Sequence, residues 1–139
     1  MMDAPLVNTP HYVLLDGKHR IGPPLVSPRS GQECVAIYGF SDKHPYDAFC
    51  SQSELALTPY PLVKGYLRNQ LEVARNAILL IVVDAAGPNA LQLNAATMQS
   101  VLESQVNQSK HVAVSFRLTR DEQSKAYHLE ESLPDLVSP

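Results

Sequence analysis

The run of residues 77–84 constrains the fold of this chain more than any other segment, because its first seven positions are all apolar and its last is Asp84. Its length and its branched side chains are typical of a β-strand that is buried on both faces, and it is too short to cross a bilayer. A strand of this kind lies in the middle of a covered sheet. We therefore expect an α+β or α/β fold, with a single-layer mixed sheet centred on residues 77–84, about three helices packed against it and a C-terminal hairpin.

The length of 139 residues suits one domain. Residues 1–10 contain two prolines and no periodicity, which predicts a loose N-terminal segment. Residues 11–131 carry all of the patterned segments and are expected to form a single globular domain. Residues 132–139 again contain two prolines and are expected to form a C-terminal tail.

Apolar alternation and turn residues predict further strands on both sides of the central one. These strands are expected at residues 11–15, 18–21, 33–40, 55–57, 111–120 and 125–131. Helices are predicted where apolar residues recur at helical spacing behind capping or proline residues. They are expected at residues 42–50, at residues 61–71 and after an N-cap at Asn94.

The charge balance argues against nucleic-acid binding. The formal net charge is −3, and no block of lysine or arginine offsets it locally, whereas phosphate backbones select basic surfaces. The first residues lack the basic and apolar regions of a signal peptide. We therefore expect a cytoplasmic protein that binds neither nucleic acid nor membranes.

The cysteines and histidines do not have the spacing of metal ligands. Cys34 and Cys50 belong to no CxxC pair, so we interpret them as reduced, buried residues rather than as nucleophiles or a disulfide. The five histidines are scattered along the chain without a spacing that places two of them on one helix face. We predict no metal, no cofactor and no catalytic residue.

Asp84 is the most suggestive single residue, because ligands of open α/β sheets gather beyond the carboxyl ends of the strands. Its carboxylate can bind a metal or act as a base there. It can equally cap the following turn by accepting backbone N–H groups, and we favour that interpretation. The ligand-binding interpretation groups Asp84 with Asn89, Ser41 and His44.

Two segments beside Asp84 allow the same pair of interpretations. Ser41 and His44 lie at a predicted helix start, where the dipole favours an anion, but helix caps look alike in proteins that bind nothing. Asn89 ends a loop that resembles a phosphate loop only in its glycine, because Pro88 removes a donor and no lysine follows. We interpret that loop as a turn.

One predicted helix combines aromatic and basic residues. Tyr60, Tyr66, Lys64 and Arg68 together could form a surface on which RNA bases stack. An ordinary amphipathic helix with tyrosines at the margin of the core has the same pattern. The acidic total favours the second interpretation.

The order of these segments resembles the N-terminal domain of the SseB family, the enhanced-serine-sensitivity proteins. The segment VAIYGFS at residues 35–41 stands where that family has "lPlFtS", IVVDAAG at 81–87 stands in place of its strand ending in "NPg", and LNAATM at 93–98 opens its last helix. The resemblance covers about residues 12–104. It implies a small cytoplasmic bacterial domain that acts as a protein-binding or accessory module, in a family without established catalytic residues.

These patterns lead to two functional expectations. The first is a non-enzymatic protein–protein interaction or accessory module, whose partner is another protein or a second copy. In a homodimer, the strand at residues 112–118 would pair along a sheet edge with its equivalent. The alternative is a small-ligand-binding protein or an enzyme with its site around Asp84.

Overall fold

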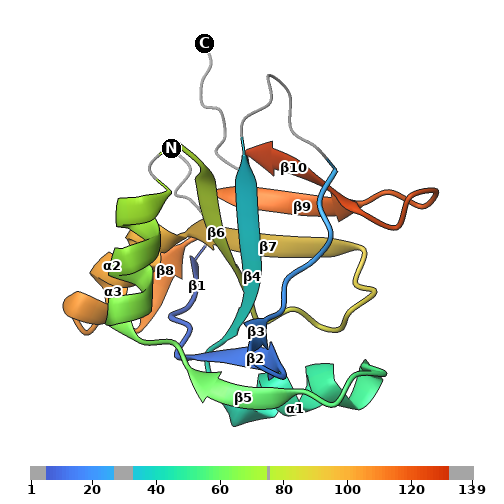
Figure 1. The fold of residues 1–139 in the computed structure, drawn as a ribbon, viewed down its shortest axis with the longest axis horizontal. Coiled ribbons are helices and arrows are strands. Elements are labelled where there is room, and N and C mark those ends of the chain that lie inside the picture. The colour runs from blue at the N-terminus through green and yellow to red at the C-terminus, as the bar shows by residue number, and fades with distance from the viewer. Residues whose placement is uncertain (1–5, 27–32, 75, 132–139) are drawn as a thin grey trace.

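The computed structural model describes residues 6–26, 33–74 and 76–131, and within them it confirms an α+β fold with a mixed sheet (Figure 1). Three helices and ten strands occur in this described part of the chain. In order, the elements are β1 (Leu6–Asn8), β2 (Tyr12–Asp16), β3 (His19–Arg20), β4 (Cys34–Phe40), α1 (Lys43–Gln52), β5 (Thr58–Pro61), α2 (Lys64–Val73), β6 (Ile78–Val83), β7 (Gln92–Thr97), α3 (Met98–Val106), β8 (His111–Ala113), β9 (Phe116–Arg120) and β10 (Tyr127–Glu131).

The apolar run forms β6, and β6 lies in the middle of the main sheet. The strand order is β10-β9-β7-β6-β4-β2-β3, and β5 also pairs with β2. Only β4 and β6 are parallel, while the other neighbours are antiparallel. In Figure 1, β7, β9 and β10 run crosswise to β4 and β6, so the sheet is strongly twisted.

Side chains of β6 alternate between two hydrophobic cores. Leu79, Ile81 and Val83 belong to a core that also takes Leu67 from α2 and Val101 from α3. Leu80 and Val82 point to the opposite face, where the core includes Phe40, Phe49, Leu118 and Tyr127. Burial on both faces is the reason that every position of this strand is apolar.

The segment between β3 and β4 connects the two ends of the sheet. Ile21 N donates to Leu14 O of β2 at 3.1 Å, and Ile21 O accepts from Tyr38 N of β4 at 3.0 Å. Further along, Tyr127 N of β10 donates to Pro24 O at 2.9 Å. The sheet therefore curls around the core that contains Phe40 and Tyr127. The edge of β10 that does not pair with β9 is hydrogen-bonded at Tyr127 to this segment.

The N-terminal expectation is wrong for the residues that the structure describes. Leu6–Asn8 form a strand antiparallel to β8, with Val7 opposite Val112. Thr9 is buried, and its hydroxyl lies 2.6 Å from that of Ser104. The partner strand is about a hundred residues away in sequence, so local periodicity could not reveal it. Residues 1–5 and the expected tail at 132–139 lie outside the described residues.

Two element boundaries also differ from the prediction. Residues 92–97 form strand β7 rather than the start of a helix at Asn94, and α3 begins after Thr97, whose hydroxyl accepts from Ser100 N at 3.0 Å. The expected strand at 55–57 instead occurs at β5, in the segment that was expected to precede helix 61–71. In both cases ladder pairing with neighbouring strands outweighs local capping signals.

The expected strand at 111–120 is two strands, β8 and β9, and only β8 lies at a sheet edge. β9 lies between β7 and β10, and β8 pairs with β1. The outer strand at the other end, β5, is a poor edge. Leu62 N donates to His11 O at 2.8 Å, so Pro59 and Pro61 direct their nitrogens away from β2 and offer no N–H to an added strand.

Candidate functional site

The structure brings together two of the four predicted site residues, Asp84 and Ser41. Asp84 Oδ1 accepts from Ser41 N at 2.8 Å, and Asp84 Oδ2 accepts from Ser41 Oγ at 2.7 Å. Asp84 N donates to Gly39 O at 2.8 Å. We call this arrangement of Asp84, Ser41 and Gly39 the Asp84 clamp. It joins the carboxyl ends of the parallel strands β4 and β6, with Asp84 at a positive φ of 50°.

The other two predicted residues make no hydrogen bond to the clamp in the described part of the chain. Asn89 Oδ1 accepts from Arg120 Nη2 of β9 at 3.3 Å. His44 is exposed in the first turn of α1, and its described surroundings offer no hydrogen bond to Asp84. Asp42 caps α1 by accepting from Lys43 N at 2.7 Å. The Lys43 ammonium pairs with Asp47, which raises the pKa of Lys43. The polar groups at this helix start therefore serve the helix itself.

The chemistry around the clamp is that of a structural joint. Both oxygens of the Asp84 carboxylate already accept hydrogen bonds from one residue, so the group is oriented by the fold. Cys34 and Cys50 are free and half-buried, and burial raises the pKa of both thiols, which disfavours the thiolate nucleophile. The residues described here contain no group of three side chains able to hold a metal ion.

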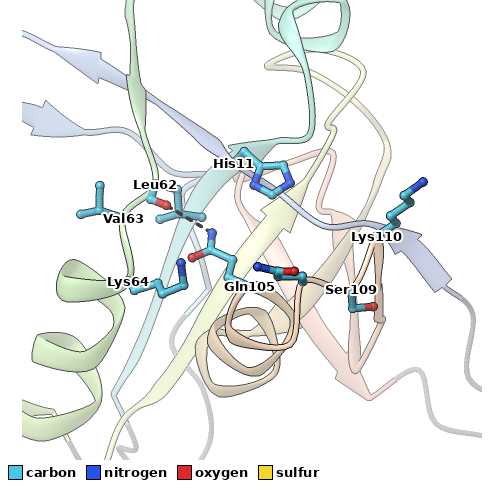
Figure 2. Close-up of a pocket in the computed structure, with 8 residues that line it drawn as sticks. His11, Leu62, Val63, Lys64, Gln105, Ser109 and Lys110 are labelled. Atoms are coloured by element: carbon cyan, nitrogen blue, oxygen red, sulfur yellow. Dashed lines mark hydrogen bonds between the residues drawn. The ribbon is translucent and has the colours of Figure 1, made fainter.

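A different pocket lies where three connections of the chain meet (Figure 2). It has a volume of about 450 Å³. The connection from β1 to β2, the connection from β5 to α2 and the turn from α3 to β8 each contribute to its wall. We call it the Gln105 pocket, and it is lined by His11, Leu62, Val63, Lys64, Gln105, Gln108, Ser109 and Lys110.

Gln105 holds these three connections in place. Its Nε2 donates to Pro10 O at 3.1 Å and to Leu62 O at 3.2 Å. Behind the pocket, Ser104 is buried, and its hydroxyl lies within hydrogen-bond distance of the Thr9 hydroxyl and of His111 O. The walls are therefore fixed by hydrogen bonds between segments that are distant in sequence, which is a preformed site.

The ionisable side chains that line the Gln105 pocket are those of Lys64, Lys110 and His11. No aspartate or glutamate lines it, and Lys64 and Lys110 have no carboxylate partner in the described part of the chain. Figure 2 shows the Lys64 side chain extending toward Gln105 with the His11 ring across from it, while Lys110 points outward at the rim. A smaller adjoining hollow of about 240 Å³ shares His11 and Lys110 and contains Asp42.

The two tyrosines around α2 lie close to an arginine of β3. The Arg20 guanidinium carbon lies 3.8 Å from the centroid of the Tyr66 ring and 6.0 Å from that of Tyr60. Burial raises the pKa of the Tyr66 hydroxyl, and the charge of Arg20 partly opposes this. Arg20 therefore occupies one face of the Tyr66 ring.

Sequence reasoning missed the Gln105 pocket. In the sequence, Lys64 forms a pattern only with the nearby residues Tyr60, Tyr66 and Arg68. The other residues, His11, Gln105 and Lys110, belong to separate segments without a motif. One local signal could have indicated an anion-binding helix start. Val63 occupies the N-cap position of α2, where a side chain that caps the helix is common, and a lysine follows it.

Comparison with known proteins assigns no family to this α+β domain. No family model, no curated protein and no solved structure matches the chain. The resemblance to the SseB family therefore remains a prediction. None of the described helices is long and apolar enough to span a membrane.

Proposed function

We propose that this chain is a non-enzymatic protein–protein interaction or accessory module, SseB-like and cytoplasmic, and that its partner protein inserts a segment into the Gln105 pocket. The observation that carries this proposal is the contrast between pocket and clamp. The Asp84 carboxylate is bonded within the fold, whereas the Gln105 pocket offers unpaired lysines beside apolar Leu62 and Val63. A binding surface needs such unused groups, and catalysis needs activated ones.

The pocket surroundings also support a protein partner. Val63 is 45% exposed and Val106 is 50% exposed, and they lie beside Leu62 and Gln105, which are hydrogen-bonded to each other. Apolar side chains next to polar groups are typical of interaction surfaces. The net charge of −3 supports the absence of nucleic acid among the partners. The prolines of β5 make pairing of a second copy along that edge the less favoured form of association.

Site-specific photo-crosslinking in cells that naturally make the protein tests this proposal. A benzophenone amino acid replaces Gln108, an exposed residue of the pocket wall, or Gln123, an exposed residue of the turn after β9. We expect discrete adducts from position 108 that are missing from position 123. Equal labelling at the two positions, or none at either, would contradict the proposal. An adduct with the mass of two chains would identify a second copy as the partner.

The alternative function is a small-ligand-binding protein or enzyme centred on Asp84. It is supported by the position of Asp84 and Ser41 at the carboxyl ends of two parallel strands. It requires Asp84→Asn to abolish binding of a co-purified small molecule, as detected by native mass spectrometry, while the melting temperature stays near that of the wild type. A lower melting temperature with no bound molecule would support the clamp role instead.

A further inference from the structure

We infer that the Gln105 pocket recognises an acidic peptide segment of the partner, and this inference rests on the proposed function. Lys64 and Lys110 contact carboxylates of that segment. Leu62 and Val63 contact an aliphatic residue next to them. The distribution of charge in and around the pocket supports this choice of ligand.

The charge of the pocket is opposite to that of the whole chain. The chain has 14 acidic and 11 basic residues, yet the pocket lining contains two lysines, one histidine and no carboxylate. The contrasting case is Lys43, whose ammonium is paired with Asp47 on the same helix. Lysines that lack such a partner keep their charge for a ligand.

The ends of the two neighbouring helices differ in polarity at the pocket, and only that of α2 favours an anion. α2 starts at the pocket wall, at Val63 and Lys64, without a side-chain cap and without an acidic residue in its first turn, so no anion of the helix itself offsets the positive end of its dipole. The C-terminal end of α3, which would favour cations, is closed by its own backbone. The carbonyls of Glu103, Ser104 and Gln105 accept from Asn107, Ser109 and Gln108 respectively.

The apolar part of the wall favours a peptide over a free inorganic anion. Leu62 is buried beneath the pocket, and Val63 is 45% exposed beside it. An inorganic anion would leave that apolar surface in water, whereas an aliphatic side chain next to the acid would cover it. A cavity of about 450 Å³ also exceeds what a single small oxyanion fills.

Asp42 defines where the acidic segment ends. It lines the adjoining hollow together with Lys110 and His11, so a carboxylate placed there would meet a like charge. Carboxylates of the ligand are therefore disfavoured beside Asp42 and most favoured toward Lys64. This orientation predicts that Lys64 contributes more to binding than Lys110, whose side chain points outward (Figure 2).

Titration of ¹⁵N-labelled protein with three probes tests the inference by NMR. The probes are a blocked peptide of sequence Asp-Glu-Leu-Glu, its uncharged counterpart Asn-Gln-Leu-Gln, and inorganic phosphate. We expect only the acidic peptide to shift the amide signals of Lys64, Gln105 and Gln108 in a saturable way. Its affinity should fall as salt is raised, because the contacts are ionic.

Matched charge variants show whether the pocket itself is responsible. The double variant Lys64→Gln with Lys110→Gln is expected to weaken the acidic peptide about tenfold, as the loss of two exposed ion pairs predicts. The control variant Lys18→Gln with Lys125→Gln removes the same charge from exposed turns elsewhere and should leave the affinity unchanged. Equal weakening by both variants would overturn the inference.

The remaining outcomes separate the two proposals. Equal binding of the charged and uncharged peptides, tighter binding of phosphate, or no binding of any probe would overturn the acidic-peptide inference. The interaction module would still stand if position 108 crosslinks to a partner while position 123 does not. Failure of the crosslinking experiment together with failure of the peptide would overturn both.

Discussion

The Asp84 clamp and the Gln105 pocket use polar side chains in opposite ways. In the clamp, each carboxylate oxygen of Asp84 accepts one hydrogen bond from Ser41, so the group joins two strand ends and is oriented by the fold. In the pocket, Gln105 joins the walls and leaves the nearby lysines unpaired. A polar residue after a buried strand is therefore not by itself a sign of function, since its hydrogen-bond partners decide its role.

The largest expected effect lies in β6, on which both regions depend. Ile81→Ala removes a fully buried side chain between α2, α3 and the sheet, and we expect a loss of about 2–5 kcal/mol in the free energy of unfolding. Urea denaturation followed by circular dichroism measures this loss. A loss below about 1 kcal/mol would contradict the central position of this strand.

A pair of glycine substitutions compares the closed clamp with the open pocket. A Cβ at Gly39 would lie 2.5 Å from Ile81 Cγ2 and 3.1 Å from Pro10 Cβ, so Gly39→Ala is expected to cost about 1–3 kcal/mol. A Cβ at Gly65, in α2 beside the pocket, would meet nothing within 4 Å. Gly65→Ala is therefore expected to stabilise the protein by about 0.5–1 kcal/mol, because alanine favours the helix. Equal effects of the two changes, measured by thermal unfolding, would remove the contrast in packing.

The clamp bonds themselves are tested by two substitutions at Asp84. Asp84→Gly removes both hydrogen bonds but tolerates the positive φ, and we expect a loss of roughly 1–2 kcal/mol. Asp84→Asn keeps an acceptor and loses the charge, so its expected loss is smaller. Ser41→Ala and the double variant complete a cycle, and additive losses would mean that the two side chains do not act together.

The smallest expected effect belongs to the pocket lysines. Lys64→Gln and Lys110→Gln remove charges that make no ion pair in the described structure, so each should change the free energy of unfolding by less than about 0.5 kcal/mol. Chemical denaturation of each variant measures this change. A loss similar to that of Asp84→Gly would show that the lysines stabilise the fold instead of remaining free for a partner.

The sequence predicted the interior of this protein better than its junctions. The run at 77–84 correctly indicated the central strand, and the alternation near the C-terminus correctly indicated a hairpin. The helix expected after Asn94 is present as α3, but its predicted start was wrong because the pairing of β7 with both β6 and β9 outweighs a capping residue. The loose segment expected at 1–10 was wrong for Leu6–Asn8, because its partner β8 is distant in sequence.

The candidate sites follow the same division. The sequence suggested that Asp84 and Ser41 both follow strands, and parallel pairing of β4 and β6 brings them together. Asn89 and His44 were grouped with them because both follow predicted strand ends, and Asn89 instead bonds to Arg120. Nothing in the spacing of His11, Lys64, Gln105 and Lys110 indicated that these residues share a pocket.

The amino-acid sequence by itself therefore determined that a doubly buried strand forms the centre of an α+β domain, because a continuous apolar run has no other stable place in water. Only the tertiary structure decided which polar side chains are used within the fold and which are left at its surface. Hydrogen bonds such as those of Gln105 to Pro10 and Leu62 join segments that no local pattern relates. The position of the pocket depends on such contacts, because its three walls come together only when the chain is folded.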